Sequence, residues 1–316
     1  MKNKKQFHHK SLKLDGQERK GLLVTAFGLH AEVEDEQGNL VRCHIRKNSD
    51  PVITGDQVYW LPEKEAGTGV IIGHLPRKSL LCRPENAHKL KLIAANLDAI
   101  IIVTAPPPVL SEDMIDRYLV ASEILKIQPV ILLNKMDLLD PEHTKEMTER
   151  LGIYQKMGYR VIYSSTYTRD GLSELDEFLR EKTCVLVGAS GVGKSSIIAA
   201  LTLEPVRVGE VSAKGLGKHT TTNTHLYHLP HNSNLIDSPG VREFGLWHID
   251  KNELLAGFIE FKSFFNECKF RNCQHEMEPG CAVQEALRNK KIDERRYASY
   301  LKILAGLGQK KKGKSK

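Results

Sequence analysis

Residues 188 to 195 read GASGVGKS, which matches the pattern G-x-x-x-x-G-K-[ST] of a phosphate-binding loop. The loop follows the apolar run TCVLVG and precedes the helix-forming run SIIAAL, as a strand–loop–helix phosphate site requires. Glycines let backbone N–H groups curl around phosphates, the lysine reaches the β and γ oxygens, and the serine hydroxyl binds Mg²⁺. The residues predicted to hold the phosphates are Gly188, Ala189, Ser190, Gly191, Val192, Gly193, Lys194, Ser195 and Ser196, with Lys194 also a catalytic candidate and Ser195 a Mg²⁺ ligand.

A second motif, LNKMD at residues 133 to 137, has the N-K-x-D spacing that holds guanine. The Asp137 carboxylate can accept hydrogen bonds from N1–H and the exocyclic amine of guanine, whereas adenine would leave that charge unpaired. Lys135 can lie along the base, and Asn134 can tie this loop to the phosphate loop. The motif SST at 164 to 166 follows another apolar run, and its backbone can offer an amide to the guanine O6. The residues predicted to bind the base are Asn134, Lys135, Met136, Asp137, Ser164 and Ser165.

Two further segments carry residue types that respond to a γ-phosphate. In DSPG, residues 237 to 240, Asp237 is predicted to bind Mg²⁺ through water, and Gly240 to offer its amide to the γ-phosphate. The segment KGLGKHTTT at 214 to 222 is Gly-rich and basic, and such a segment can become ordered only when γ-phosphate is present. One of its threonines can complete the Mg²⁺ shell; the candidates are Thr220, Thr221 and Thr222.

These motifs occur in an unusual order, with the guanine motif before the phosphate loop. A circular permutation explains this order, if the helix-like run GLSELDEFLREK at 171 to 182 is joined directly to the strand TCVLVG and new chain ends open elsewhere. Permutation is tolerated because the termini of compact domains often lie close together. The motifs therefore predict one intact GTPase site.

The glutamine that orients the attacking water in several GTPases is missing from this chain. Val241 follows Gly240, and its side chain neither donates nor accepts a hydrogen bond. Intrinsic hydrolysis should therefore be slow unless another group substitutes. His219, beside the threonines of the 214–222 segment, is the candidate, because an imidazole can position or deprotonate water. The alternative is that His219 contacts RNA or the backbone of its own segment.

Metal-binding residue types cluster in CKFRNCQHEMEPGC, residues 268 to 281, with the spacing C-x4-C-x-H-x5-C. Three thiolates and one imidazole make a closed tetrahedral shell for a structural Zn²⁺. A disulfide framework is unexpected in a chain without an export signal. The predicted zinc ligands are Cys268, Cys273, His275 and Cys281, whereas Cys43, Cys82, Cys184, His8 and His9 have no such neighbours.

Three structured regions are expected to position these groups, because 316 residues are too many for one typical domain. Residues 20–88 contain about five short strands punctuated by glycines, which predicts a small β-barrel or sandwich. Five strands fit an OB-like barrel, a fold that commonly binds oligonucleotides, and this region is predicted to bind RNA. Residues 89–247 alternate strands and helices, with Ser111 as a helix N-cap, and predict a mostly parallel sheet covered by helices. Residues 248–308 are predicted to form a helical zinc-binding domain.

The net charge of +7 lies partly at the chain ends. Residues 1–19 and 309–316 are predicted to be basic, flexible tails; a run of lysines favours a polyanionic partner, and a merely solvated tail is the alternative. The basic run EALRNKKIDERRYASYLK leaves the same two alternatives open. Apolar runs are far shorter than the roughly 20 residues of a membrane helix, and no secretory signal is recognisable. The sequence therefore predicts a cytoplasmic protein.

The order NKMD, GASGVGKS, GLGKHTTT, DSPG and CKFRNCQHEMEPGCAV, over nearly the whole chain, resembles the circularly permuted GTPases of small-ribosomal-subunit assembly, the RsgA (YjeQ/YloQ) family. The resemblance implies an OB fold, a permuted GTPase core and a C-terminal zinc domain. It also implies rRNA binding and GTP hydrolysis with Mg²⁺, stimulated by the small subunit in a late maturation step near the decoding region. A similar use of the histidine in GLGKHTTT is implied, and the protein is expected to be a monomer.

Two other functions compete with this expectation. The first is an RNA-binding assembly factor whose GTP site only sets conformation. In that case a Lys194 or Ser195 variant would still complement loss of the protein in a cell. A phosphotransferase acting on a small molecule predicts no guanine preference, which the N-K-x-D motif disfavours.

Overall fold

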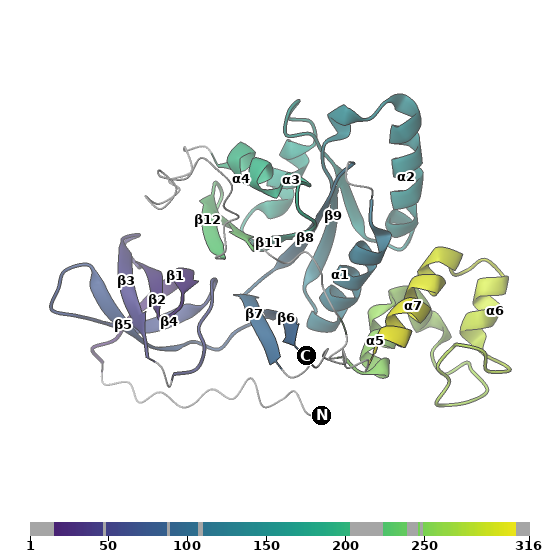
Figure 1. Ribbon diagram of the computed structural model, residues 1–316, viewed down its shortest axis with the longest axis horizontal. Coiled ribbons are helices and arrows are strands. Elements are labelled where there is room, and N and C mark those ends of the chain that lie inside the picture. The colour runs from purple at the N-terminus through teal and green to yellow at the C-terminus, as the bar shows by residue number, and fades with distance from the viewer. Residues whose placement is uncertain are drawn as a thin grey trace, which may run out of the picture.

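The computed structural model describes residues 16–46, 49–86, 89–106, 110–202, 224–238, 246 and 249–307 of the chain. Within them a small β-barrel, an α/β domain with a large sheet and a set of C-terminal helices follow one another (Figure 1). No helix in this described part is long and apolar enough to cross a membrane.

The N-terminal barrel consists of β1 (Arg19–Phe27), β2 (His30–Asp35), β3 (Leu40–Ile45), β4 (Gln57–Pro62) and β5 (Thr68–His74). The strands pair in the order β1-β2-β3-β5-β4, and pairing of β4 with β1 closes the barrel. Alternate residues point inward, so that Leu23, Val33, Trp60 and Ile71 form its buried core. The predicted OB-like barrel is confirmed.

A separate hairpin, β6 (Leu80–Asn86) and β7 (Lys89–Ala95), connects the barrel to the α/β domain. Its two strands pair antiparallel along their length. The boundary expected between residues 88 and 89 therefore falls between two paired strands. The sequence pattern did not reveal this hairpin, because Pro84 and several charged residues interrupt it.

The α/β domain contains strands β8 (Ala99–Thr104), β9 (Gln128–Leu133), β10 (Arg160–Tyr163), β11 (Thr183–Val187), β12 (His225–Leu229) and β13 (Ser233–Asp237), with helices α1 (Glu112–Leu125), α2 (Pro141–Lys156), α3 (Leu172–Leu179) and α4 (Lys194–Leu201). The strand order is β10-β9-β8-β11-β13-β12, and only β12 is antiparallel to its neighbour in this order. Helix α3 leads directly into β11, which is the junction that the circular permutation predicts. Ser111 occupies the N-cap of α1, but its side chain makes no capping hydrogen bond.

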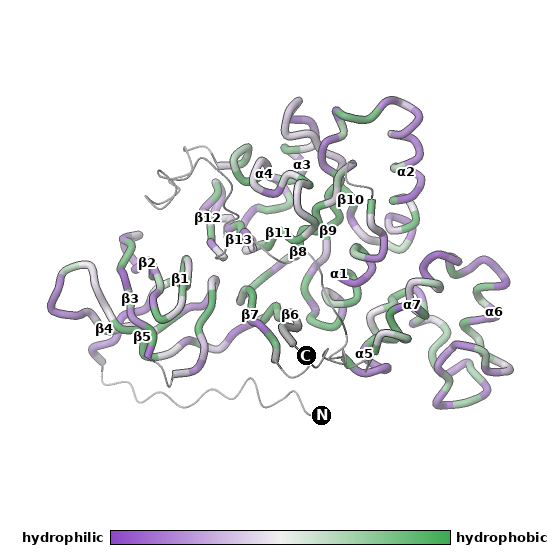
Figure 2. Tube along the Cα trace, in the orientation of Figure 1, coloured by the Kyte–Doolittle hydropathy of each residue, from purple (hydrophilic) through white to green (hydrophobic). Residues whose placement is uncertain are grey.

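The distribution of hydrophobic residues matches the positions of the strands and helices. Every residue of β8 is buried, as expected of a central strand that is covered on both faces. In Figure 2 hydrophilic residues colour most of α2, outside the sheet, whereas hydrophobic residues dominate the central strands. Helix α2 accordingly buries few side chains, among them Met147, Leu151 and Tyr154.

The C-terminal region contains α5 (Lys251–Gly257), a 3-10 segment η3 (Ile259–Phe264), α6 (Ala282–Arg288) and α7 (Glu294–Gly306). These elements share one hydrophobic cluster with α1, which includes Tyr118, Leu254, Phe258 and Tyr300. The C-terminal helices therefore pack on the α/β domain, and the fully buried part of this packing surface is apolar with one exception.

That exception is a buried charge network between α1 and α7. The fully buried carboxylate of Asp116 accepts hydrogen bonds from Arg296 at 2.7 Å, Arg295 at 2.9 Å and the Tyr154 hydroxyl at 2.8 Å. Arg296, also buried, donates two further bonds to Glu260. Burial works to raise the pKa of Asp116, but the two guanidinium groups outweigh it, and the pKa lies below its ordinary value.

We expect Asp116→Asn to destabilise the protein by about 3–5 kcal/mol, because it leaves buried guanidinium charge without its counter-ion. Asp113→Asn is the matched control: it removes a more exposed carboxylate of the same helix, paired with Lys302, and should cost about 0–1 kcal/mol. Urea unfolding measures both costs, and equal values would contradict the prediction. Because the folded-state pKa of Asp116 is depressed, its contribution is complete above the ordinary carboxyl pKa and is lost as the pH falls through the depressed value.

Candidate nucleotide site and metal centre

The predicted nucleotide motifs lie at the carboxyl ends of parallel strands. Asn134 follows β9, Ser164 follows β10, Gly188 follows β11 and Asp237 ends β13. These strands belong to the parallel run β10-β9-β8-β11-β13. Parallel strands end at the same edge of a sheet, and open α/β sheets bind ligands outside that edge. Motifs that are far apart in the sequence are therefore brought to one place.

The loop of the guanine motif is ordered by Ser165. The Ser165 hydroxyl donates to Oδ1 of Asp137 at 2.5 Å, and it accepts the amides of Tyr167 at 3.1 Å and Thr168 at 3.0 Å. Because the two amides occupy its acceptor side, the hydroxyl directs its single proton to Asp137. This bond fixes the position of one carboxylate oxygen and with it the plane of the carboxylate.

Asn134 joins the guanine motif to the phosphate loop. Its side chain is fully buried, and its amide donates to the carbonyl of Val192 at 3.0 Å. The buried Ser164 hydroxyl lies 3.4 Å from Oδ1 of Asn134. A Cβ atom at Gly193 would lie only 2.3 Å from the amide nitrogen of Asn134. The junction therefore needs both an amide at 134 and a glycine at 193.

The phosphate loop has the backbone that its glycines allow. Gly188, Gly191 and Gly193 have φ angles of 144°, 82° and 97°, a region that other residues rarely adopt. A Cβ atom at Gly188 would lie 2.2 Å from the carbonyl oxygen of Val103, so no larger residue fits there. Helix α4 begins at Lys194. The Lys194 ammonium donates to the carbonyl of Gly188 at 2.9 Å and to that of Ala189 at 2.8 Å. The lysine thus folds back over the loop that it follows.

Asp237 brings a carboxylate next to this loop. It is opposite Leu186 of β11, two residues before Gly188. Its Oδ1 is buried and has no hydrogen-bond partner among the described residues. Burial raises the pKa of Asp237, and Lys194 works in the opposite direction. A buried carboxylate oxygen without a partner is costly, and a Mg²⁺-bound water is the kind of group that would satisfy it.

Some of the remaining predicted residues lie in the described part of the chain and others lie outside it. Around the loop, Ser190, Gly191, Ser195 and Ser196 are exposed, Ala189 is half-buried and Val192 is buried. Lys135 and Met136 are half-buried, and Lys135, with φ 63°, precedes the 3-10 turn η2 (Met136–Leu138). The residues His219, Thr220, Thr221, Thr222, Gly240 and Val241 lie outside the part of the chain that the structure describes.

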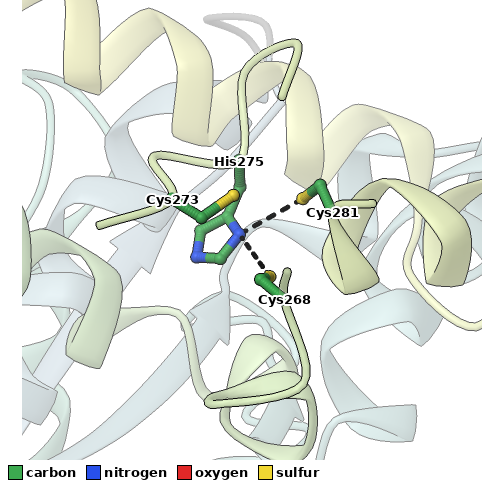
Figure 3. A group of neighbouring side chains, drawn as sticks. All are labelled: Cys268, Cys273, His275 and Cys281. Atoms are coloured by element: carbon green, nitrogen blue, oxygen red, sulfur yellow. Dashed lines mark hydrogen bonds between the residues drawn. The ribbon is translucent and has the colours of Figure 1, made fainter. Parts of the chain in front are cut away.

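The predicted metal ligands converge in space (Figure 3). The four ligand atoms of Cys268, Cys273, His275 and Cys281 all lie within 4.8 Å of one another. Nδ1 of His275 is 3.5 Å from the sulfur of Cys268 and 3.3 Å from that of Cys281. Tetrahedral zinc with bonds of about 2.3 Å to sulfur and about 2.0 Å to nitrogen places these atoms roughly 3.5 Å apart. The donor set and its spacing therefore fit a zinc ion.

Two backbone amides can stabilise bound thiolates, whereas burial raises the pKa of the Cys273 and Cys281 thiols. The backbone amide of Ala282 donates to the sulfur of Cys268 at 3.3 Å, and the amide of Gln284 to that of Cys281 at 3.5 Å. Burial lowers the pKa of His275, although the Glu278 carboxylate opposes the shift, and the net effect favours the neutral imidazole. A neutral imidazole is the form that binds metal.

Two residues that support the metal centre were not identified from the sequence. The hydroxyl of Tyr297 donates to the carbonyl of His275 at 2.6 Å, and that of Tyr300 to the carbonyl of Gln274 at 2.7 Å. Their spacing of three residues places both on one face of α7. A pair of tyrosines at this spacing, next to a Cys/His cluster, is the signal that points to this role, because buried tyrosine hydroxyls usually find a polar partner.

Comparisons with known proteins agree with this arrangement. The family model of the RsgA GTPase matches residues 74–247. The crystal structure of YjeQ from Thermotoga maritima is 33% identical in sequence, with 92% of this chain and 98% of that chain covered and a TM-score of 0.74. The crystal structure of YloQ, a circularly permuted GTPase, is 25% identical, with 93% of this chain and 97% of that chain covered and a TM-score of 0.69. With the permuted motifs at one sheet edge, these matches show that the chain belongs to the RsgA family of circularly permuted GTPases and hydrolyses GTP.

Proposed function

We propose that this GTPase acts in late maturation of the small ribosomal subunit, where it binds rRNA in the GTP-loaded state and is released on hydrolysis. The observation that carries the proposal is the direct pairing of an OB-type barrel with the sheet of the nucleotide site, through β1 and β12. Barrels of this type commonly bind oligonucleotides. The positive net charge and the family of the chain support the same partner.

One end of the barrel offers groups suited to unpaired bases. Phe27, the last residue of β1, and Leu29, in the turn before β2, are 42% and 43% exposed. The ring of His30 lies 6.0 Å from that of Phe27 and 4.8 Å from that of His44, measured between ring centroids. Exposed aromatic rings stack on bases in many OB folds that bind single strands. This cluster supports the proposal that the polyanion bound by the barrel is RNA.

In the nucleotide site, we propose the following roles, which rest on the sequence motifs and, for the described residues, on their contacts. Asp137, oriented by Ser165, accepts from guanine N1–H and the exocyclic amine. The phosphate loop and Lys194 hold the β- and γ-phosphates, and Ser195 and Asp237, with one threonine of 220–222, hold Mg²⁺. Bound Mg²⁺ neutralises charge that develops on the phosphates during hydrolysis. Gly240 offers its amide to the γ-phosphate, and His219 positions the attacking water in place of the missing glutamine.

The decisive experiment measures GTP hydrolysis by the purified protein with and without small ribosomal subunits at physiological salt. We expect a slow basal rate that rises many-fold with small subunits, no rise with large subunits, and no turnover of ATP. Lys194→Ala should remove turnover in both conditions. His219→Ala should remove the stimulated rate and leave nucleotide affinity unchanged; full stimulated turnover in this variant would show that His219 is not catalytic.

The second candidate function, an RNA-binding assembly factor whose GTP site only sets conformation, predicts a different outcome. In that case GTP binds tightly and small subunits bind the protein, but they do not accelerate hydrolysis. The absence of stimulation would therefore reject the proposal that hydrolysis releases the protein from the small subunit.

A further inference from the structure

Strand β12 lies between β1 of the barrel and β13, which ends in the nucleotide site. Paired residues of these three strands form one row across the sheet. Thr25 of β1 is opposite His225 of β12, and His225 is opposite Asp237 of β13. Both pairs are antiparallel, and directly opposite residues on such strands have Cβ atoms about 4.5–5.5 Å apart on the same face. The barrel is therefore separated from Asp237 by a single residue of β12.

Two barrel hydroxyls hold the start of this strand. Thr25 Oγ1 and Thr54 Oγ1 both donate to the carbonyl oxygen of Thr224, at 2.9 Å and 3.1 Å. Both threonines are almost fully buried, at 7% and 2% exposure, so water does not compete freely for the carbonyl. Thr224 directly precedes β12 and lies two residues after Thr222, the last of the three predicted Mg²⁺ threonines.

The loop that carries Thr54 also touches the strand of Asp237. Gly55 has φ 90°, and a Cβ atom there would lie 2.4 Å from the carbonyl oxygen of Ala95 and 3.3 Å from Cδ1 of Ile236. Ile236 is the residue before Asp237. The side chain of Asn96 donates to the carbonyl of Gly55 at 2.8 Å and holds the loop in this position. The barrel is thus in close contact with both β12 and β13.

The other end of β12 is bound to the barrel as well. His228 Nε2 lies 2.5 Å from Oε2 of Glu34 on β2, while Nδ1 of the same ring lies 2.8 Å from Oδ1 of Asn234 on β13. This imidazole therefore bridges the barrel and the α/β domain. A displacement of the barrel must either move β12 with it or break the bonds at both ends of the strand.

The joint between the barrel and β12 includes an exposed ion pair, unlike the charge network that holds the C-terminal helices. Those helices are held by Asp116 and Arg296, which are both fully buried. The joint between the barrel and β12 contains one register pair, two hydroxyl bonds and a His228–Glu34 contact whose side chains are 52% and 23% exposed, and Val24 of β1 also belongs to the apolar cluster of the α/β domain. Exposed ion pairs contribute much less than buried networks. The exposed His228–Glu34 pair is therefore the contact of this joint that contributes least to its strength.

We propose that β12 couples the barrel to the nucleotide site, and that Thr25 and Thr54 are positioning residues that set the place of Asp237 through this strand. A partner that binds the barrel then alters the Mg²⁺ site, and the state of the Mg²⁺ site alters the hold on the barrel. The coupling rests on the proposed role of Asp237 in Mg²⁺ binding. It does not depend on the identity of the partner.

The test uses the full-length protein without ribosomes. The affinity for fluorescent GDP is measured in Mg²⁺ and in EDTA, together with the basal rate of GTP hydrolysis, for wild type and for Thr25→Val/Thr54→Val. We expect the gain in affinity that Mg²⁺ provides, and the basal rate, to fall roughly three- to tenfold, since two hydrogen bonds are lost. The affinity in EDTA should not change. Thr68→Val is the matched control, because that barrel threonine donates to the carbonyl of Glu65, within the barrel.

Hydrogen exchange of the β12 amides, followed in the same samples, makes the negative outcomes informative. Faster exchange with unchanged Mg²⁺ dependence and rate would show that β12 is a passive tether and would overturn the proposal. Unchanged exchange would show that the hydroxyls do not hold β12, which overturns it equally. Asp237→Asn serves as the reference: if it leaves the Mg²⁺ dependence intact, the proposed role of Asp237 fails, and the coupling scheme with it. Failure of ribosomal stimulation, by contrast, leaves this experiment unaffected.

Discussion

Asp137→Asn should reverse the base preference of the site, with a loss of GDP affinity on the order of 10⁴-fold and a gain in affinity for xanthosine diphosphate. The reason lies in the bond from Ser165. Its hydroxyl donates to Oδ1 of residue 137, so in the variant the amide oxygen stays at this position and the amide NH₂ replaces Oδ2. That NH₂ then faces the exocyclic amine of guanine, donor against donor. Xanthine carries a carbonyl at this position and accepts the bond.

Competition between fluorescent GDP and unlabelled GDP or xanthosine diphosphate measures this switch. The matched control is Asp140→Asn, which changes a nearby carboxylate that caps α2 by accepting the amide of His143. That variant should keep the guanine preference. If Asp137→Asn binds GDP within about threefold of wild type, Asp137 does not read the base, and the guanine site must be sought elsewhere.

The parts of the fold that sequence patterns predicted are those with local signals. Short apolar runs separated by glycines predicted about five strands in residues 20–88, and the barrel is built of the five strands β1 to β5. The motifs NKMD, SST, GASGVGKS and DSPG were found because each follows an apolar run, and parallel strands bring such ends together. The zinc ligands were found because they lie within 14 consecutive residues, from Cys268 to Cys281, and all four converge.

Interactions between distant segments gave no such signal. Asp116 lies in a helical pattern where a carboxylate normally faces solvent, and its partners Arg295 and Arg296 are 179 and 180 residues away. The run HLYHL of β12 is short, and its pairing with the barrel depends on Thr25, 200 residues earlier in the chain. Such contacts depend on how domains pack. The side-chain periodicities of strands (about 2 residues) and helices (about 3.6 residues) carry no information on that packing. The pairing of β12 with the barrel and the Asp116 charge network therefore became visible only in the three-dimensional structure.

Removal of zinc is expected to unfold the segment from Cys268 to Cys281 and to loosen α6, while nucleotide binding is retained. In small zinc domains the metal contributes on the order of 10 kcal/mol of apparent binding free energy at neutral pH, which is an upper bound here. Part of the region should stay packed without metal, because Phe258 and Tyr300 belong to the apolar cluster shared with α1. Helix α6 is more dependent, because its N-cap is the ligand Cys281.

The measurement combines metal content by native mass spectrometry with hydrogen exchange before and after treatment with a strong chelator. We expect one zinc per chain, and its loss should accelerate exchange in residues 268–288 but not in the phosphate loop. Cys281→Ser should reproduce the effect without chelator, whereas Cys82→Ser, a free cysteine outside the cluster, should not. Metal release should also set in as the pH falls, because protons compete with zinc for the thiolates and the imidazole. Retention of slow exchange in a metal-free chain would show instead that the tyrosines of α7 suffice to hold the loop.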